Sequence, residues 1–393
     1  MAACLIVGLI ACNSVSAQFR YHTPPKSAHP LMQRQHEFDL PSLLVTDSGQ
    51  PVTSKEQWFE SRRPELIAHW RRILGKLRPA PEDARWFGDI TKSVEINREQ
   101  KDGYTRIELQ IPIETDFLQP HVLLIPDNAE PGQCPAVIAW TSTGPDYRQP
   151  EEWWGRWLAQ HGCVVLTGWA HIRNYRNGIS YRNGVNKAVY DRFGHWLPMA
   201  KMVDDVQREV EYLKAAVPAV DPERIGFMGF SLSAKSALYV AAFSDDIKAT
   251  VSIDPHLAMH GDTNYHDEWY LDWRHRFDDI QTPGYPDAEL RGTVFSLLDA
   301  DPARPGFERN HHELLALAAP RAMMVIGCST DQDTAVHSDD RQSIAYVNRA
   351  REVYDLLGIS DRLQYAPLTC GHKADHPDVT AAWQPFLRRW LEF

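Results

Sequence analysis

The run RIGFMGFSLSAKSALYVAAF, residues 224–243, constrains the fold of this chain more than any other stretch. Its first part reads as a short apolar strand, and its second part, from Leu232, reads as a helix rich in Ala, Leu and Val. Ser231 stands at the junction, with Gly229 two residues before it and Ser233 two residues after it. A sharp turn there would lift the serine hydroxyl above the sheet, where the helix N-terminus favours developing negative charge. The pattern predicts that Ser231 is a nucleophile; the alternative is an ordinary serine cap.

From residue 134 onward, apolar strands alternate with helices. The expected strands are PAVIAW, CVVLTG, RIGFMGF, IKATVSI, RAMMVIG and RLQYAPL; the helices between them include EEWWGRWLAQHG, MVDDVQREVEYLKAAV, ELLALAA and SIAYVNRAREVYDLL. Such alternation predicts an α/β fold, with a mostly parallel central sheet and helices on both faces. The shorter stretches SVEIN, YTRIELQIPI and HVLLIP, between Lys92 and Pro126, predict an antiparallel start to the same sheet. In such sheets ligands bind beyond the carboxyl ends of the strands.

The first residues, MAACLIVGLIACNSVSAQ, are a short apolar run followed by small residues. This pattern resembles a signal peptide over residues 1–17, although a positively charged start is missing. We therefore expect an exported protein, periplasmic or secreted. Cys12 in L-I-A-C also fits a lipobox, which would make the product a lipoprotein. The structural alternative is a short buried helix.

Residues 18–91 are predicted to be an N-terminal extension. Ser54 and Gln57 match a capping box at the start of one amphipathic helix. Its apolar stripe has helical spacing and is typical of a core-facing helix: Trp58, Leu66, Ile67, Trp70, Ile73, Leu74 and Leu77.

Composition excludes several classes of function. The chain has 393 residues, of which 43% are hydrophobic and 24% charged, which suits a globular protein with one large α/β domain and additions. A net charge of -11 argues against nucleic acid or an anionic membrane as partner. After the first residues no stretch is apolar for long enough to span a bilayer. The sequence contains neither H-E-x-x-H nor C-x-x-C, so we expect no metal and no other cofactor.

A serine nucleophile needs a base and an acid that orients the base. His372 follows the last expected strand, in LTCGHKADHP, and Gly371 gives the loop room. We predict that His372 is the base and that Asp333, which follows the strand RAMMVIG, is the acid. Asp331 and Asp339 remain open for the acid. A solvated surface role is the alternative for each of these side chains.

Two backbone N–H groups are predicted to form an oxyanion hole. The first belongs to Leu232, the residue after the nucleophile. The second is expected from the loop after PAVIAW, where Thr141-Ser142-Thr143-Gly144 lies, at Ser142 or, next, at Thr143. A plain Ser/Thr turn is the alternative for this loop.

Residues 254–312 are predicted to be an insertion at the catalytic end, dense in His, Trp and Tyr, that acts as a lid or pocket wall. The chain has thirteen tryptophans, and Trp140, Trp153, Trp154 and Trp169 stand near the ends of the expected catalytic strands. Aromatic faces suit the apolar faces of sugar rings. We predict that Trp140 and Trp169 bind substrate and that others belong to the core.

Two cysteines are predicted to lie close together. Cys328 ends the strand before the acid loop, and Cys370 stands two residues before the predicted base. In an oxidising compartment they would be able to form a disulfide; the alternative is two buried thiols.

Three pieces of the chain carry a family resemblance: VDPERIGFMGFSLSAKSALYVAAFSDDIKATVS, HHELLALAAPRAMMVIG and the GH near the C-terminus. They resemble the α/β-hydrolases, specifically the exported dienelactone hydrolase-like and acetyl xylan esterase-like serine esterases of bacteria. The resemblance implies an α/β-hydrolase domain over residues 92–393, with the acid and then the histidine following the serine along the chain. It also implies an esterase that forms an acyl-enzyme and deacetylates a small-molecule or polysaccharide ester of carbohydrate. Ser233, Phe230 and the TSTG loop depart from the family pattern.

Other functions remain open. Lys235, four residues after Ser231, is similar to a lysine in the motif of the glucuronoyl esterases, which implies that it binds substrate; the alternative is a helix surface residue. Those enzymes carry arginine directly after the serine, where this chain has Leu232. A prolyl-oligopeptidase-like peptidase would need a propeller-sized N-terminal domain. An inactive hydrolase-fold binding protein would not need the complete set of serine, aspartate and histidine.

Overall fold

The computed structural model describes residues 40–142, 144, 146–170, 175–176, 185–255, 257, 310–328 and 343–393. The expected signal peptide lies outside the described residues, as do Asp331, Asp333 and Asp339. Most of the expected insertion, residues 254–312, lies outside them as well.

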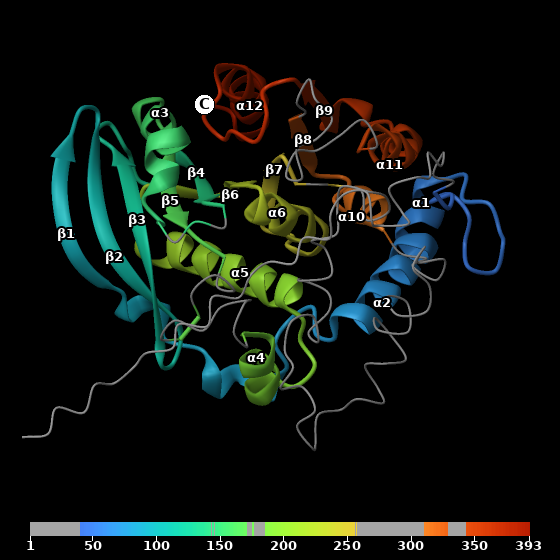
Figure 1. Cartoon of the computed structure of the whole chain (residues 1–393), viewed down its shortest axis with the longest axis horizontal. Helices are drawn as coiled ribbons and strands as arrows, with labels where there is room; N and C mark the ends of the chain where they lie inside the picture. Colours follow the sequence, from blue (N-terminus) through green and yellow to red (C-terminus); the bar gives the residue numbers. More distant parts are fainter. Residues whose placement is uncertain are drawn as a thin grey trace, which may run out of the picture.

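A nine-stranded sheet forms the centre of the fold, in the order β1-β2-β3-β5-β4-β6-β7-β8-β9 (Figure 1). The strands are β1 Val94–Lys101, β2 Tyr104–Glu114, β3 Phe117–Pro126, β4 Cys134–Trp140, β5 Val164–Gly168, β6 Val220–Phe230, β7 Ile247–Ile253, β8 Ala322–Cys328 and β9 Leu363–Leu368. The pairs β1–β2, β2–β3 and β3–β5 are antiparallel, and all pairs from β5 to β9 are parallel. The predicted α/β fold, with its antiparallel start and parallel remainder, is confirmed.

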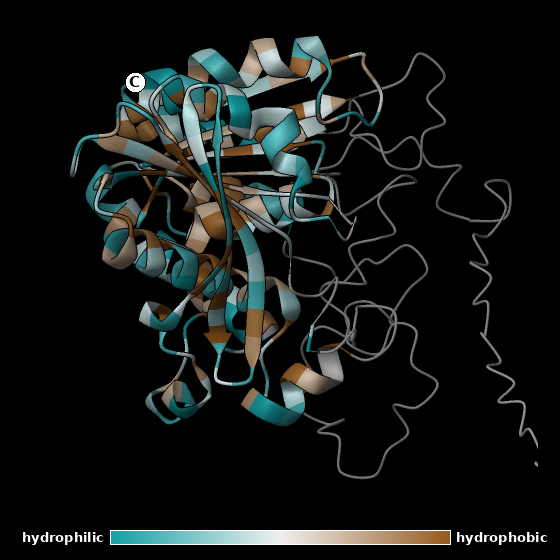
Figure 2. Ribbon diagram, turned by 90° about the vertical axis from the view of Figure 1, so that its left-hand side faces the viewer, coloured by the Kyte–Doolittle hydropathy of each residue, from teal (hydrophilic) through white to brown (hydrophobic). Residues whose placement is uncertain are grey.

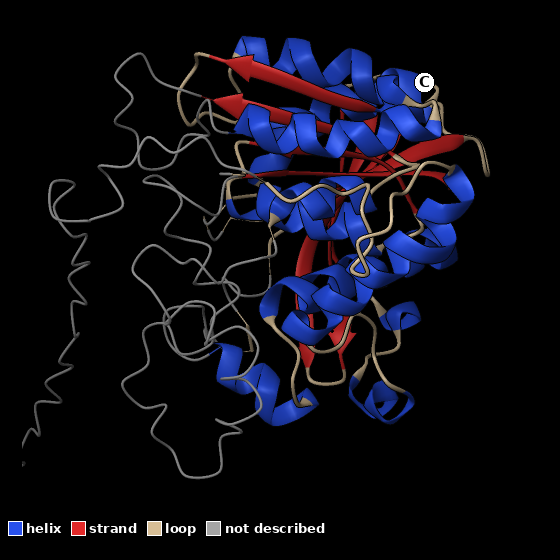
Figure 3. Ribbon diagram, turned by 90° about the vertical axis from the view of Figure 1, so that its right-hand side faces the viewer, coloured by secondary structure: helices blue, strands red, loops and turns tan. Residues whose placement is uncertain are grey.

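Helices cover both faces of the sheet (Figure 3). The described helices are α1 Lys55–Gln57, η3 Trp58–Arg62, α2 Arg63–Leu74, η4 Pro81–Trp86, η5 Ile90–Lys92, η6 Glu151–Gly155, α3 Arg156–Gln160, α4 Val185–Phe193, α5 Pro198–Ala216, α6 Leu232–Phe243, α10 His311–Leu317, α11 Ser343–Leu357, η10 Ser360–Arg362 and α12 Pro377–Leu391. None of these helices is long and apolar enough to cross a membrane.

The core has two layers because successive side chains of a strand point to opposite faces. In β4, Val137 packs in the layer that includes α3 and α12, whereas Ile138 packs in the layer that includes α2, α5, α6, α10 and α11. Every residue of β4 is buried, as expected for a central parallel strand. Hydrophobic residues (brown) run along the strands between the helices, while the outer turns of many helices are hydrophilic (teal) (Figure 2).

The N-terminal helix packs on this core. It runs without interruption through α1, η3 and α2, and the Ser54 hydroxyl accepts a hydrogen bond from the Gln57 N–H at 3.3 Å. The Gln57 side chain reaches back to the N–H of Thr53 rather than of Ser54. Trp70 lies edge-on to Tyr239 of α6, with ring centroids 5.8 Å apart. The extension is therefore anchored on the helix that follows Ser231.

Candidate active site

Ser231 lies at the turn between β6 and α6 in a strained backbone conformation. Its φ is 58° and its ψ is -114°, a region that non-glycine residues rarely adopt. Its N–H donates to the Ile253 carbonyl at 2.9 Å, which ties the turn to β7. A Cβ at Gly229 would lie 2.4 Å from the Ser233 carbonyl oxygen, so this position needs glycine. The local sequence thus builds a sharp elbow that leaves Ser231 partly exposed.

The register of the central strands brings distant residues to this elbow. Trp140 of β4 pairs with Gly229 of β6, so Ser142 and Ser231 each lie two residues beyond the same pair. On the other side of β6, Phe230 pairs with Ile253, and Asp254 follows directly.

His372 and Asp254 are joined by a side-chain hydrogen bond at the same edge of the sheet. The contact joins His372 Nδ1 to Asp254 Oδ2, while Asp254 Oδ1 accepts the Cys328 N–H at 3.3 Å. Asp254 is fully buried and its own N–H donates to the Ile326 carbonyl at 2.7 Å. An ionised carboxylate only accepts hydrogen bonds, so Nδ1 carries the proton and Nε2 is left as an acceptor. That tautomer can take a proton from a serine hydroxyl.

Phe230 places the imidazole next to the elbow. Its ring centroid lies 4.3 Å from that of His372, and Trp153 meets the same phenyl ring edge-on at 5.8 Å. The loop before the imidazole turns at Gly371, whose φ is 66°. Beyond the imidazole, the Trp154 indole N–H donates to the Ala374 carbonyl at 3.0 Å. Phe230, one of the departures from the family pattern, thus forms a wall for the base.

The predicted acid, Asp333, lies outside the described residues, and its role stays a prediction. Among the residues that the structure describes, the carboxylate at His372 is Asp254. Sequence reasoning treated Asp254 only as the start of the insertion. A signal was present: Asp254 is the first polar residue after the strand IKATVSI, which follows the elbow helix directly and therefore was a candidate neighbour of β6.

Burial lowers the pKa of His372 from its ordinary value of 6.5 to about 4. The side chain is 26% exposed, and the Asp254 carboxylate opposes the shift because it stabilises the imidazolium. A lowered pKa keeps the imidazole neutral, and so able to accept a proton, in mildly acidic solution.

We therefore expect kcat/KM to decrease at low pH with a midpoint below pH 6.5, toward about 4. The reason is that the base is inactivated only when it binds a proton. The measurement is a pH profile on an ester without ionisable groups. Circular dichroism at each pH is the control for unfolding. An acid limb centred at or above pH 6.5 in folded protein would contradict the lowered pKa of His372.

The other predicted site residues differ in their surroundings. Trp140 is fully buried, and its indole N–H donates to both carboxylate oxygens of Glu209, at 2.9 and 3.1 Å. This corrects the prediction of a substrate contact, because a core side chain offers no surface to a ligand. Trp169 is 5% exposed at the end of β5 and packs edge-on against Tyr147; its role stays a prediction.

Lys235 is not on the helix surface, since it is only 3% exposed. Its charge lies near enough to His311 of α10 to contribute, after burial, to lowering the pKa of that imidazole to about 3. His311 also contacts the Leu257 carbonyl at 2.8 Å. Lys235 thus occupies an interior position one helical turn from Ser231.

Cys328 and Cys370 are neighbours, as predicted, because a side-chain hydrogen bond joins the two thiols. Both are free and buried, so the structure has the two-thiol alternative and not the disulfide. The described side chains form no group of three or more His, Cys, Asp or Glu that could hold a metal ion.

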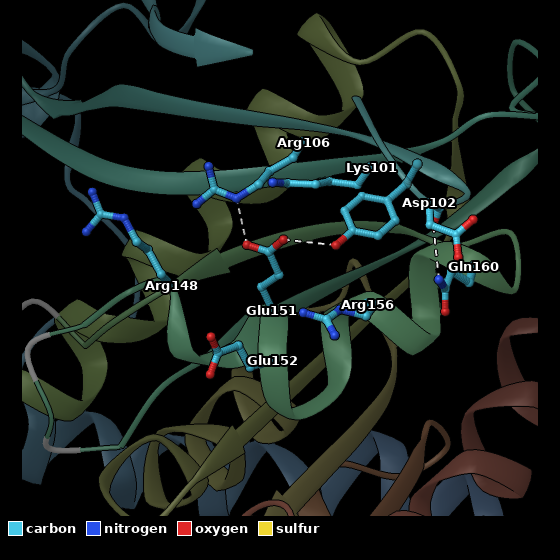
Figure 4. A pocket seen from close by; sticks show the side chains of 9 residues that line it. Lys101, Asp102, Arg106, Arg148, Glu151, Glu152, Arg156 and Gln160 are labelled. Carbon is cyan, nitrogen blue, oxygen red and sulfur yellow. Dashed lines mark hydrogen bonds and ion pairs between the residues drawn. The ribbon is translucent and has the colours of Figure 1, made fainter. Parts of the chain in front are cut away.

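A separate pocket of about 500 Å³ lies between the β1–β2 turn and the helices η6 and α3 (Figure 4). Its wall is polar: Glu151 accepts hydrogen bonds from Tyr104, at 3.0 Å, and from Arg106, at 2.7 Å. None of Ser231, Asp254 and His372 lines it. We place the candidate active site at the elbow and not here, because, of these two described places, the elbow combines a nucleophile with a base.

The chain is similar to known families over parts of its length. Residues 121–267 match the dienelactone hydrolase family, and residues 199–358 match the glucuronyl esterase model for fungi. No curated protein matches the whole chain or a part of it.

Several solved structures share the architecture. A glucuronoyl esterase from Solibacter usitatus has a TM-score of 0.63 at 17% identity, over 91% of this chain and 98% of that one. A carbohydrate esterase family 15 glucuronoyl esterase from Caldicellulosiruptor kristjansonii has a TM-score of 0.59 at 17% identity, over 93% of both chains. A mutant glucuronoyl esterase from Sporotrichum thermophile, in complex with methyl 4-O-methyl-β-D-glucopyranuronate, has a TM-score of 0.57 at 17% identity. The match covers 90% of this chain and 87% of that one. The chain therefore has the α/β-hydrolase fold.

Proposed function

We propose that this protein is a serine esterase that cleaves carboxylic esters of carbohydrate through an acyl-enzyme. The observation that carries the proposal is the convergence at one sheet edge of Ser231, in a strained elbow, with the hydrogen-bonded pair His372 and Asp254. Both matching families and the similar structures named above are consistent with ester hydrolysis.

In the proposed first step His372 Nε2 takes the proton from Ser231 Oγ, which attacks the ester carbonyl carbon. The negative charge that develops on the carbonyl oxygen is received by the N–H groups of Leu232 and Ser142. The C–O bond to the alcohol then breaks, and the alcohol leaves with the proton from His372. In the second step His372 removes a proton from water, the hydroxide attacks the acyl-serine, and a carboxylic acid is released as Ser231 regains its proton.

Two classes of carbohydrate ester fit this site. An acetylated sugar would place the carbohydrate on the leaving-alcohol side, whereas an ester of a uronic acid would place it on the acyl side. The similarity to glucuronoyl esterases and the interior position of Lys235, one turn from Ser231, favour the uronate ester. Leu232, in place of the arginine of that motif, leaves acetyl esters as the second candidate.

Turnover of three substrates separates these functions: a methyl glucuronate ester, an acetylated xylo-oligosaccharide and a peptide amide. We expect the highest kcat/KM on the uronate ester, because sugar contacts that strengthen in the transition state raise kcat/KM. Preference for the acetylated sugar would change the proposed substrate to an acetyl ester, and the protein would still be a carbohydrate esterase. Preference for octanoyl over acetyl p-nitrophenyl esters, with no activity on sugar esters, would indicate a general carboxylesterase. Cleavage of the amide alone would indicate a peptidase, and no turnover at all would indicate a binding protein.

Export remains part of the proposal and rests on the apolar first residues. Mass spectrometry of the mature N-terminus tests it, since cleavage after Ala17 and lipidation at Cys12 give different masses. An uncleaved, unmodified chain from the native host would overturn it.

A further inference from the structure

We infer that Ser233 is a positioning residue for the oxyanion hole. It holds the peptide group between Thr141 and Ser142, which carries the N–H of Ser142. The inference rests on the proposed function of Ser231. Ser233 is fully buried in the first turn of α6, and its hydroxyl donates a hydrogen bond to the carbonyl oxygen of Thr141. This bond joins the nucleophile helix to the first residue after β4, 92 positions earlier in the chain.

The geometry of one peptide group links this bond to the proposed chemistry. The carbonyl of Thr141 and the N–H of Ser142 belong to the same planar peptide unit. In a trans peptide the two groups point in opposite directions, so a bond that fixes the carbonyl also fixes the N–H. The Ser142 N–H therefore points away from Ser233 and the helix interior. Hydrogen bonding at the carbonyl also polarises the peptide and makes its N–H a stronger donor.

Two further hydrogen bonds of Thr141 act on other parts of the residue. The Thr141 N–H donates to the Gly168 carbonyl at 3.0 Å, and its hydroxyl donates to Gln149 Oε1 at 3.0 Å. Both bonds hold the residue itself, and neither sets the rotation of the peptide that follows it. The hydrogen bond from Ser233 acts directly on that peptide, through its carbonyl oxygen.

This role explains why serine stands two residues after the nucleophile, where the G-x-S-x-G pattern has glycine. Glycine at that position allows the same tight elbow but carries no hydroxyl. The elbow of this chain keeps the first glycine of that pattern, Gly229, where a Cβ would lie 2.4 Å from the Ser233 carbonyl oxygen. At position 233 the chain carries a side chain that reaches the neighbouring loop.

The test compares Ser233→Ala and Ser233→Gly with Ser244→Ala. Ser244 is a matched control: it caps the other end of α6, is 2% exposed, and donates to Gln207 Oε1 at 3.3 Å. We measure kcat and KM on p-nitrophenyl acetate, the ratio of kcat/KM between this ester and its thiono analogue, and the melting temperature. The larger, weakly accepting sulfur of the thiono ester makes the ratio sensitive to the oxyanion hole.

Loss of one oxyanion donor lowers kcat by about 10²- to 10³-fold, so its misalignment should lower kcat by at least about tenfold in both Ser233 variants. KM should stay within about twofold of wild type, and the oxygen-to-sulfur ratio should fall. Ser244→Ala should keep the wild-type kcat and ratio. If kcat falls with an unchanged ratio, or does not fall at all, the inference is overturned while the proposed function stands. If Ser233→Ala does not fold, Ser233→Gly decides by the same criteria. A wild-type protein without Ser231-dependent ester turnover removes the proposed function itself.

Discussion

Ser231→Ala is expected to lower kcat for ester hydrolysis by at least about 10³-fold, because the acyl-enzyme cannot form without the serine oxygen. The remaining rate would come from substrate binding and the oxyanion hole. The measurement is steady-state turnover of p-nitrophenyl acetate, together with a labelling assay in which a fluorophosphonate reacts with wild type only.

The folded state should tolerate this change. Ser231 is partly exposed and its structural bond, to the Ile253 carbonyl, comes from the backbone N–H that alanine also has. Ser244→Ala is the control for nonspecific loss of activity, because it removes the hydroxyl of a buried serine at the C-terminal end of α6. Hydrolysis by Ser231→Ala at a rate near wild type would refute the assignment of the nucleophile.

Asp254→Asn is expected to lower kcat by about 10³- to 10⁴-fold while the protein remains folded. The amide oxygen can still accept the Cys328 N–H, so the connection to β8 survives. At His372 the amide N–H₂ would donate to Nδ1, which moves the imidazole proton to Nε2 and leaves no acceptor for the serine proton. The measurement is kcat on the same ester, with KM expected to change little.

Asp333→Asn is the matched variant, because Asp333 is the acid predicted from the sequence. If Asp254 orients the base, Asp333→Asn should retain most of the activity. If Asp333→Asn is the more damaging variant, the acid that orients His372 lies in the loop after β8. A comparable loss of activity in both variants would mean that both carboxylates orient the base. Asp331→Asn and Asp339→Asn extend the comparison to the alternatives in the same loop.

Much of the fold follows from local sequence patterns. The expected strand IKATVSI and the expected helix SIAYVNRAREVYDLL coincide with β7 and α11 in the structure. The elbow is equally local, because a strand, a glycine and a helix within twenty residues determine the turn. Hydrophobic periodicity and the small residues of a turn involve neighbours along the chain, so the sequence alone is enough to predict the elements that they form. The helix α4 was not predicted, although Val185, Val189 and Phe193 recur at helical spacing and are buried in the core.

The partners of Ser231 depended on pairing between distant segments. Asp254 and His372 are 118 positions apart, and they meet because β7 lies between β6 and β8 while β9 forms the far edge. Sequence position alone could not rank Asp254 above Asp333, since each follows a parallel strand.

Burial likewise became visible only in three dimensions. Trp140 and Trp169 both follow the pattern of residues at a strand end, yet Trp140 turns inward to Glu209 while Trp169 packs near the loop at Tyr147. The sequence by itself therefore determined the elements, the elbow and the histidine loop, which depend on local propensity. The tertiary structure brought Asp254 to the histidine and placed Trp140 in the core, because strand order and side-chain burial are properties of the assembled sheet.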